Sequence, residues 1–327
     1  MNSLATSAST RPGWRSWATE YLGLIAALGL LVLVFSLCTQ HFFSRTTFLT
    51  IANQIPAVLL VAIAMTFVLV IAEIDLSVGS VLGLCTGVLG VALMEWNWPL
   101  PLAVLAAALA GVACGAFNGA VSLQWRLPSF IVTLGMLEMA RGGAHAITGS
   151  RTQFIGPAIA PIADLHLLGL SLPFLLSMGV VVVGQLVLTR TVFGRHLVAV
   201  GTNVEAVRLS GIDPRPLKFA VFSIAGLLVA TAAVIDTARY QSANPNAGSG
   251  FELQAIAAAV IGGTSLMGGR GSVIGTLFGV LIIAVLNSGL ATVGARDETK
   301  RLVTGAVIIA AVILDQYRHR WSERKSS

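Results

Sequence analysis

Residues 51–72 read IANQIPAVLLVAIAMTFVLVIA, and this stretch decides the class of fold. It contains no Asp, Glu, Lys or Arg. An α-helix needs about 20 mainly apolar residues to cross the hydrocarbon core of a bilayer. The stretch therefore predicts a membrane-spanning helix.

The same length rule, applied outward along the chain, finds about ten apolar segments of this kind. Of the 327 residues, 56% are hydrophobic and 10% are charged, whereas a soluble chain carries roughly 25% charged residues. We therefore expect an all-α polytopic membrane protein, with one membrane domain at 21–316 and cytoplasmic tails at 1–20 and 317–327. The expected spans are 21–39, 51–72, 77–94, 101–123, 129–148, 167–189, 217–238, 252–267, 272–293 and 302–316. The segment 252–267 is short and rich in alanine and glycine, so the alternative for it is a helix buried among others instead of a lipid-facing span.

Basic residues indicate the orientation, because Lys and Arg accumulate in short cytoplasmic loops. With the N-terminus inside, 13 of the 20 basic residues fall in cytoplasmic segments and an even number of spans returns the C-terminus to the cytoplasm. The net charge of +6 then reflects topology in a lipid environment and requires no nucleic-acid partner. We expect the first apolar stretch to be a retained helix, since no small-x-small cleavage site follows it.

Motifs of catalysis are missing from the sequence. Cys38, Cys85 and Cys114 lie singly in apolar spans, and the five histidines have no metal-ligand spacing. Residues 263–269 resemble a phosphate-binding loop but lack its lysine. We therefore expect no enzyme, no metal and no cofactor on this chain. If ATP drives transport, ATP and Mg²⁺ bind to a partner ATPase.

Three glycine ladders with a spacing of four residues predict close helix packing, because they place small residues on one helix face. The ladders are Gly79, Gly83 and Gly87; Gly111, Gly115 and Gly119; and Gly271, Gly275 and Gly279. The first and third share the patterns GSVLG (79–83) and GSVIG (271–275). This similarity indicates either a remnant of internal duplication or convergent packing, and we favour convergent packing.

Ionisable residues within predicted spans are few, and such residues are functional candidates because burial in lipid is costly. Asp75 precedes a predicted helix and is a candidate for a helix cap or a gate. Glu252, at the start of the eighth span, is a second candidate for either role. Glu138 and Arg141 lie one helical turn apart, so we expect them to neutralise each other, the alternative being a proton relay.

Several strings resemble motifs of the ribose-type permeases of binding-protein-dependent ABC importers. The strings are IDLSVGS (74–80), Asn118-Gly119, PSFIVTLG (128–135), ELQAIAA (252–258), GGTSL (262–266) and GGRG (268–271). The resemblance implies a type II-like permease of the bacterial inner membrane that pairs as a homodimer or heterodimer. It also implies one or more ATPase subunits and an extracytoplasmic sugar-binding protein. Glu73 and Gln254 depart from the family pattern, where glycine and aspartate are usual.

Residues 190–218 form the longest basic loop, and a short helix is predicted within it. Thr202 and Glu205 read as a capping box, and Gly211 suits the left-handed end of the helix. The resemblance implies that this is the coupling helix on the ATPase, with Thr202, Glu205, Val207, Arg208 and Gly211 as its site residues. The alternative is an ordinary solvated loop.

A neutral sugar needs hydrogen-bonding groups along its path but no opposite charge. The candidates to line the path are Asn53, Gln54, Asn118 and Asn287, each of which can instead bond one helix to another. The sequence leaves two rivals to an ABC permease. An ion-coupled secondary transporter would require Glu138 or Asp236, and an intramembrane enzyme or scaffold would act without an ATPase.

Overall fold

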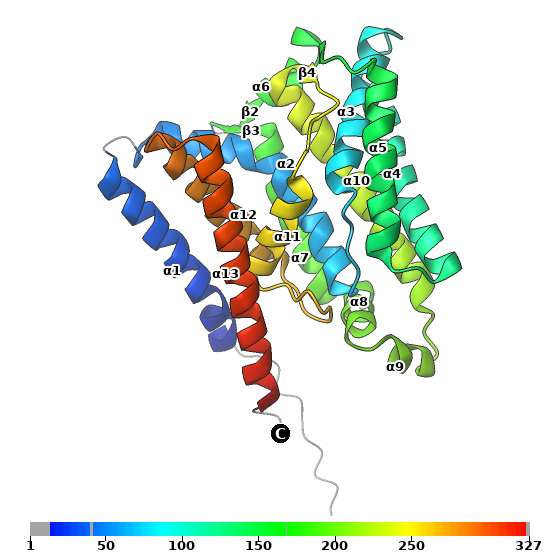
Figure 1. Ribbon diagram of the computed structural model, residues 1–327, viewed down its shortest axis with the longest axis vertical. Coiled ribbons are helices and arrows are strands. Elements are labelled where there is room, and N and C mark those ends of the chain that lie inside the picture. The colour runs from blue at the N-terminus through cyan, green and yellow to red at the C-terminus, as the bar shows by residue number, and fades with distance from the viewer. Residues whose placement is uncertain (1–13, 40–41, 168, 325–327) are drawn as a thin grey trace, which may run out of the picture.

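The computed structural model describes residues 14–39, 42–167 and 169–324, and it is helical almost throughout (Figure 1). The helices are α1 (Trp14–Cys38), α2 (Arg45–Val70), α3 (Val78–Met94), α4 (Leu100–Trp125), α5 (Ser129–Thr148), α6 (Ala160–Asp164), α7 (Leu172–Arg190), α8 (Val192–Thr202), α9 (Val204–Leu209), α10 (Pro214–Tyr240), α11 (Phe251–Ile261), α12 (Val273–Thr292) and α13 (Asp297–Arg324), with a 3-10 turn at Gly156–Ala158. Two short antiparallel pairs lie in the loops, β1 (Gln153–Phe154) with β4 (Ser242–Ala243) and β2 (His166–Leu167) with β3 (Leu170–Ser171).

The all-α membrane fold is confirmed, but the predicted count of about ten spans is not supported. In the described part of the chain, α1, α2, α4, α7, α10 and α12 are the six helices long and apolar enough to cross a membrane. Every predicted span coincides with a helix, yet α3 has 17 residues and α11 has 11. The chain is thus a multi-pass protein that also contains helices too short to span alone.

The helices extend into both expected tails. The first helix begins at Trp14, and the last continues to Arg324. Residues 1–13 and 325–327 of those tails lie outside the described residues.

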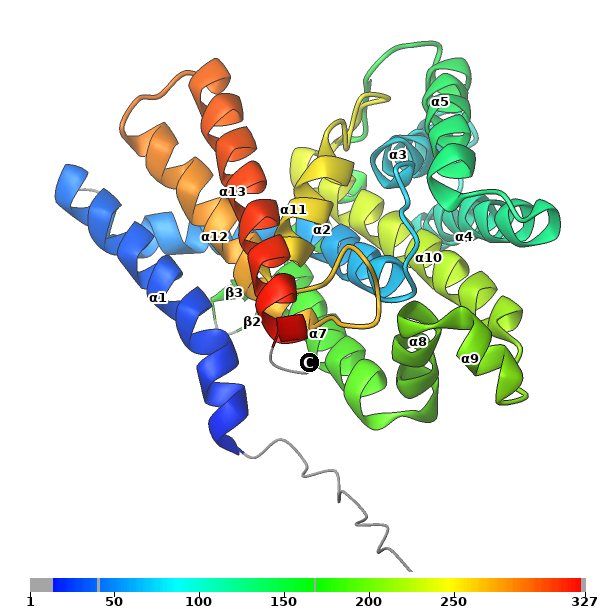
Figure 2. The same cartoon turned by 60° about the horizontal axis from the view of Figure 1, so that its bottom comes forward.

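Helix α2 is the centre of the molecule. From Leu59 to Val70 all of its residues except Thr66 are apolar, and a helix that is apolar on all sides is stable only when it is buried. From Leu59 to Ile71 its side chains are almost completely enclosed, with Phe67 the most exposed at 7%. Figures 1 and 2 both show α1, α12 and α13 on one side of α2 and α3, α4, α5 and α10 on the other.

The glycine ladders are packing seams, as predicted. A Cβ at Gly115 of α4 would overlap the Phe222 carbonyl oxygen of α10. A Cβ at Gly279 of α12 would likewise overlap the Ala258 carbonyl oxygen of α11. Backbone therefore packs directly on backbone along both seams.

The two GSV repeats occupy different helical positions. Gly79 and Ser80 lie inside α3, whereas Gly271 precedes α12 and Ser272 is its N-cap. The Ser272 hydroxyl accepts a hydrogen bond from Gly275 N at 3.0 Å. Because the two repeats occupy different positions relative to the start of their helices, convergent packing explains their similarity better than internal duplication does.

Candidate functional site

A polar pocket of about 540 Å³ lies where the start of α2 meets the end of α12 and the start of α13. We call it the α2–α12 pocket. Its lining consists of Thr46, Thr47, Thr50, Gln54, Asn287, Ser288, Ala291, Thr292 and Lys300. Two of the four predicted path residues, Gln54 and Asn287, therefore meet in one pocket although they are far apart in the sequence.

The lining is chemically suited to a neutral, hydroxyl-rich solute. It offers four threonine hydroxyls, one serine hydroxyl and two amides, and it has no carboxylate. Its one cation, Lys300, donates a hydrogen bond to Asp297 Oδ1 at 3.0 Å. This hydrogen bond and the positive charge of Lys300 lower the pKa of Asp297. In the described part of the chain, no cluster of His, Cys, Asp and Glu has the composition of a metal site.

The other two predicted path residues do not line the α2–α12 pocket. Asn53 is exposed beside Gln54. Asn118 is 1% exposed and its Nδ2 donates to Ser77 Oγ at 3.0 Å, which joins α4 to the start of α3. The helix-to-helix alternative therefore describes Asn118 better than pore lining does.

Asp75 lies in an extended segment that leads into α3, and it is 3% exposed. Its Oδ1 accepts hydrogen bonds from Ser77 N at 2.9 Å and from Ser77 Oγ at 2.6 Å. The residue at the N-cap of α3 is Ser77, so the prediction that Asp75 caps the helix is wrong by two positions. The carboxylate instead fixes the residue that begins the helix.

The predicted basic loop contains two helices, α8 and α9, where one was expected. The capping box is wrong, because Thr202 ends α8 and its hydroxyl donates to Val198 O at 2.8 Å. Asn203 is the N-cap of α9, and its Oδ1 accepts from Ala206 N at 3.0 Å. Glu205 forms an exposed ion pair with Arg208 at 3.2 Å.

The end of α9 follows the prediction. Gly211 has φ +81°, in the left-handed region, and its N–H donates to Arg208 O at 2.9 Å. Val207 is buried at 6% exposure, whereas Leu209 is 88% exposed, the highest value for a large apolar side chain in the described residues. Helix α9 is thus anchored on one face and presents an uncovered leucine on the other.

Comparison with known proteins identifies the family. Residues 47–312 match the family described as "Branched-chain amino acid transport system / permease component". The chain belongs to this permease family. The match covers more than three quarters of the permease and includes α9 and every residue of the α2–α12 pocket except Thr46.

Named relatives cover nearly the whole length of the permease. Ribose import permease protein RbsC of Haemophilus influenzae is 38% identical over 296 residues, which are 89% of this chain and 91% of the relative. The RbsC of Escherichia coli (strain K12) is 37% identical over 308 residues, 92% and 95% of the two chains. Xylose transport system permease protein XylH of Escherichia coli (strain K12) is 33% identical over an alignment of 373 positions, gaps included, which covers 95% of each chain. No solved structure matches the chain.

These relatives confirm the expected resemblance to ribose-type permeases and the expectation of a transport subunit rather than an enzyme. They favour the permease over an ion-coupled transporter.

The structure also locates the gate candidate Glu252 and the two departures from the family pattern, Glu73 and Gln254. Glu252 lies in the first turn of α11, and a Cβ at Gly79 of α3 would overlap its Oε2. The starts of α3 and α11 are therefore in contact. Glu73 pairs with Lys218 of α10, and Gln254 lies one turn into α11.

Arg141 does not form the predicted ion pair with Glu138. Among the described residues, the ion pairs within 4.0 Å do not include these two side chains. Arg141 Nη1 instead donates to Pro245 O at 2.8 Å and to Ala247 O at 3.3 Å. In the permease this arginine holds the loop between α10 and α11 against α5.

Sequence reasoning missed two sets of positioning residues. Ser129 Oγ accepts from Ile74 N at 3.0 Å, and Thr133 Oγ1 accepts from Leu76 N at 3.1 Å, so α5 holds the segment before α3. The sequence feature that could have predicted this contact is the pair Ser129 and Thr133, two hydroxyl residues four positions apart that share one face of an apolar helix. Gln185 of α7 accepts from Val273 N at 2.9 Å and thereby caps α12, and this contact has no local signal.

Proposed function

We propose that this chain is the membrane-spanning subunit of a bacterial ABC importer that translocates a small neutral sugar of the pentose or hexose type. The α2–α12 pocket supports this proposal most directly, because neutral hydroxyl and amide groups line it and its one cation is paired. The relatives named for ribose and xylose transport support the same class of solute.

The proposed assembly contains two permease subunits, which are either identical or related, in the inner membrane. One or more ATPase subunits bind ATP and Mg²⁺ on the cytoplasmic side, and an extracytoplasmic binding protein delivers the sugar. Family membership supports partners of this general kind.

We assign coupling to α9. Its exposed Leu209 offers an apolar contact to the ATPase, and buried Val207 fixes the helix to the body. The preceding helix, α8, ends at a tight junction, since a Cβ at Gly201 would overlap Val70 O of α2. Gly269 N donates to the same oxygen at 2.9 Å, so a displacement of α8 reaches both α2 and the loop before α12.

Both termini are expected in the cytoplasm. The Trp14 end of α1 and the Arg324 end of α13 lie at the same end of the molecule as α8 and α9 (Figure 1). The excess of basic residues in the segments at that end supports a cytoplasmic location for it. Alkaline phosphatase fused near Ser3 or at Ser327 should be inactive and green fluorescent protein fused there should fluoresce. An active phosphatase at either end would contradict this topology.

The α2–α12 pocket is tested by replacing Asn287 with leucine. This change removes a hydrogen-bonding amide and should lower sugar uptake about two- to tenfold, in line with the worth of one hydrogen bond. Uptake is measured in vesicles that contain the permease, its ATPase and its binding protein. The matched control is Asn53→Leu, the same change at an exposed position outside the pocket lining, and it should leave uptake unchanged.

Equal uptake by the Asn287→Leu variant and the wild type would remove the pocket from the sugar path. Uptake that persists without ATP and stops when an ionophore collapses the ion gradient would contradict the importer itself.

A further inference from the structure

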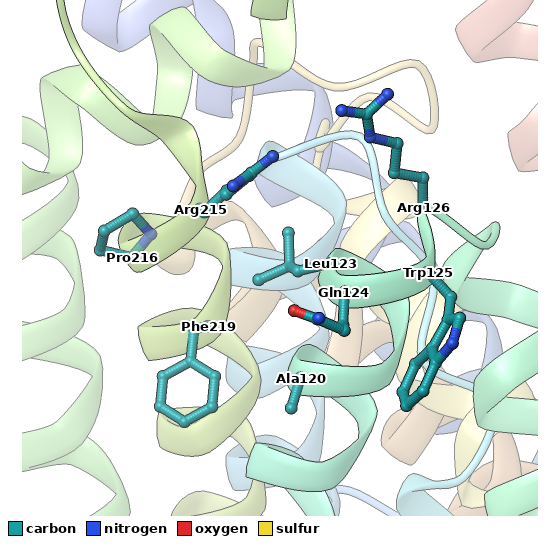
Figure 3. A pocket seen from close by; sticks show the side chains of 8 residues that line it. All are labelled: Ala120, Leu123, Gln124, Trp125, Arg126, Arg215, Pro216 and Phe219. Carbon is teal, nitrogen blue, oxygen red and sulfur yellow. The ribbon is translucent and has the colours of Figure 1, made fainter.

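A second cavity, of about 660 Å³, opens between the end of α4 and the start of α10 (Figure 3). We call it the α4–α10 pocket. It is lined by Ala120, Leu123, Gln124, Trp125, Arg126, Arg215, Pro216 and Phe219. We propose that this pocket binds an anionic phospholipid, with the phosphate at the two arginines and an acyl chain along the apolar wall.

The polarity of the pocket supports a ligand with a charged head and an apolar tail. Figure 3 shows the side chains of Arg126 and Arg215 toward one end and those of Ala120, Phe219 and Trp125 toward the other. Trp125 is 66% exposed and Phe219 is 42% exposed. Tryptophan is enriched at the height of the lipid headgroups, so the boundary between the two halves falls where a phosphate lies.

Both arginines are available to an anion. Neither has a carboxylate within 4.0 Å among the residues that the structure describes. A guanidinium binds a phosphate through two parallel hydrogen bonds, which makes arginine well suited to this contact.

The surrounding charges leave a positive excess. A smaller cavity of about 240 Å³ shares Arg126 and Arg215 and is also lined by Arg208, Lys218 and Glu73. Glu73 pairs with Lys218, and Glu205 pairs with Arg208. Between residues 204 and 218, Asp213 is the one other acidic residue. It is the N-cap of α10 and accepts a hydrogen bond from the backbone nitrogen of Arg215 at 3.0 Å.

Lipid suits the position of the pocket better than a protein surface does. Only 22% of the residues in the most apolar 18-residue stretch of α4 are buried, so most of this helix is left to face the membrane. The pocket lies at the end of the molecule that carries α9, which we place at the cytoplasmic leaflet, where anionic lipids attract basic residues. An acidic surface on the ATPase is the rival occupant.

The test compares two double variants of the purified full-length permease that lose the same charge. Arg126→Gln with Arg215→Gln removes the pocket arginines. Arg190→Gln with Arg195→Gln, the control, removes two exposed arginines outside the pocket lining. Native mass spectrometry without any ATPase measures binding of phosphatidylglycerol and of phosphatidylcholine with identical acyl chains.

The pocket variant should bind phosphatidylglycerol about thirtyfold more weakly than the control, since each of the two arginines contributes about 1 kcal/mol near a membrane surface and about 1.4 kcal/mol corresponds to a tenfold change in affinity. Phosphatidylcholine binding should be the same in both. A third variant, Ala120→Trp, fills the apolar half without changing charge and should also weaken phosphatidylglycerol binding.

Three results would overturn the proposal. Equal losses in both double variants would show diffuse attraction to charge. Unchanged lipid binding, combined with weaker binding of the ATPase to the pocket variant in a separate pull-down experiment, would identify a protein-docking surface. Complete competition by inorganic phosphate, with no effect of Ala120→Trp, would show an anion site that holds no lipid chain.

Discussion

The Gly211→Val variant is expected to insert into the membrane normally and yet lose most sugar uptake and most stimulation of ATP hydrolysis by the binding protein. Gly211 has φ +81°, and a β-branched residue strongly resists that conformation. Forcing it costs about 1–3 kcal/mol, which is enough to displace the end of a six-residue helix such as α9. The measurement is uptake and ATPase activity in vesicles that contain all the partners.

A matched control separates strain from coupling. Gly149 also has a positive φ, +60°, and likewise has open space around it, but it follows α5 at the other end of the molecule and lies outside the α2–α12 pocket. Gly149→Val should therefore strain the chain without uncoupling it. The Leu209→Ser variant should uncouple without backbone strain, because it removes only the exposed apolar contact. Wild-type activity in both the Gly211 and Leu209 variants would exclude α9 as the coupling element.

The Gly115→Val variant is expected to prevent stable folding of the permease. A side chain at this position meets the Phe222 carbonyl oxygen and Gly226 N, which are backbone atoms of α10 that cannot rotate away. Helix α4 would have to separate from α10 along their shared seam, so we expect a loss of about 3 kcal/mol, at the upper end of the usual overpacking cost. Thermal unfolding in detergent and the fraction of monodisperse protein measure this effect.

Gly135→Val is the control for that experiment. Gly135 lies inside α5, and a Cβ there meets nothing within 4 Å. It tests the cost of valine in a helix without the clash, and the variant should fold nearly as well as the wild type. Equal damage from both substitutions would show that the α4–α10 seam tolerates a larger spacing.

The sequence predicted helix positions well because length and hydropathy are local properties. It failed to count the spans for two reasons. Helices α3 and α11 are short, and they are apolar because they are buried among other helices, whereas α5 and α13 are long enough to span but not apolar enough. Whether an apolar helix meets lipid or protein depends on its neighbours. The local indication of this in the sequence was that the predicted segment 252–267 is short and rich in alanine and glycine.

The candidate site was predictable only in part. Asn53 and Gln54 are adjacent, so they point about 100° apart on a helix, and the sequence cannot tell which of them faces a cavity. The cap of α9 was misplaced by one residue because Thr202 and Asn203 both have side chains that can cap a helix. By contrast, the left-handed Gly211 was predictable, since few other residues fit that conformation.

The short helices also have a consequence for biosynthesis. With 11 residues and Glu252 in its first turn, α11 cannot remain in lipid alone once it leaves the translocation channel. The seam that receives it, formed by Gly275 and Gly279 of α12, has not yet been synthesised at that moment. We therefore infer that α11 and α12 enter the bilayer as a pair, so that a nascent chain ending before α12 would leave α11 outside the membrane.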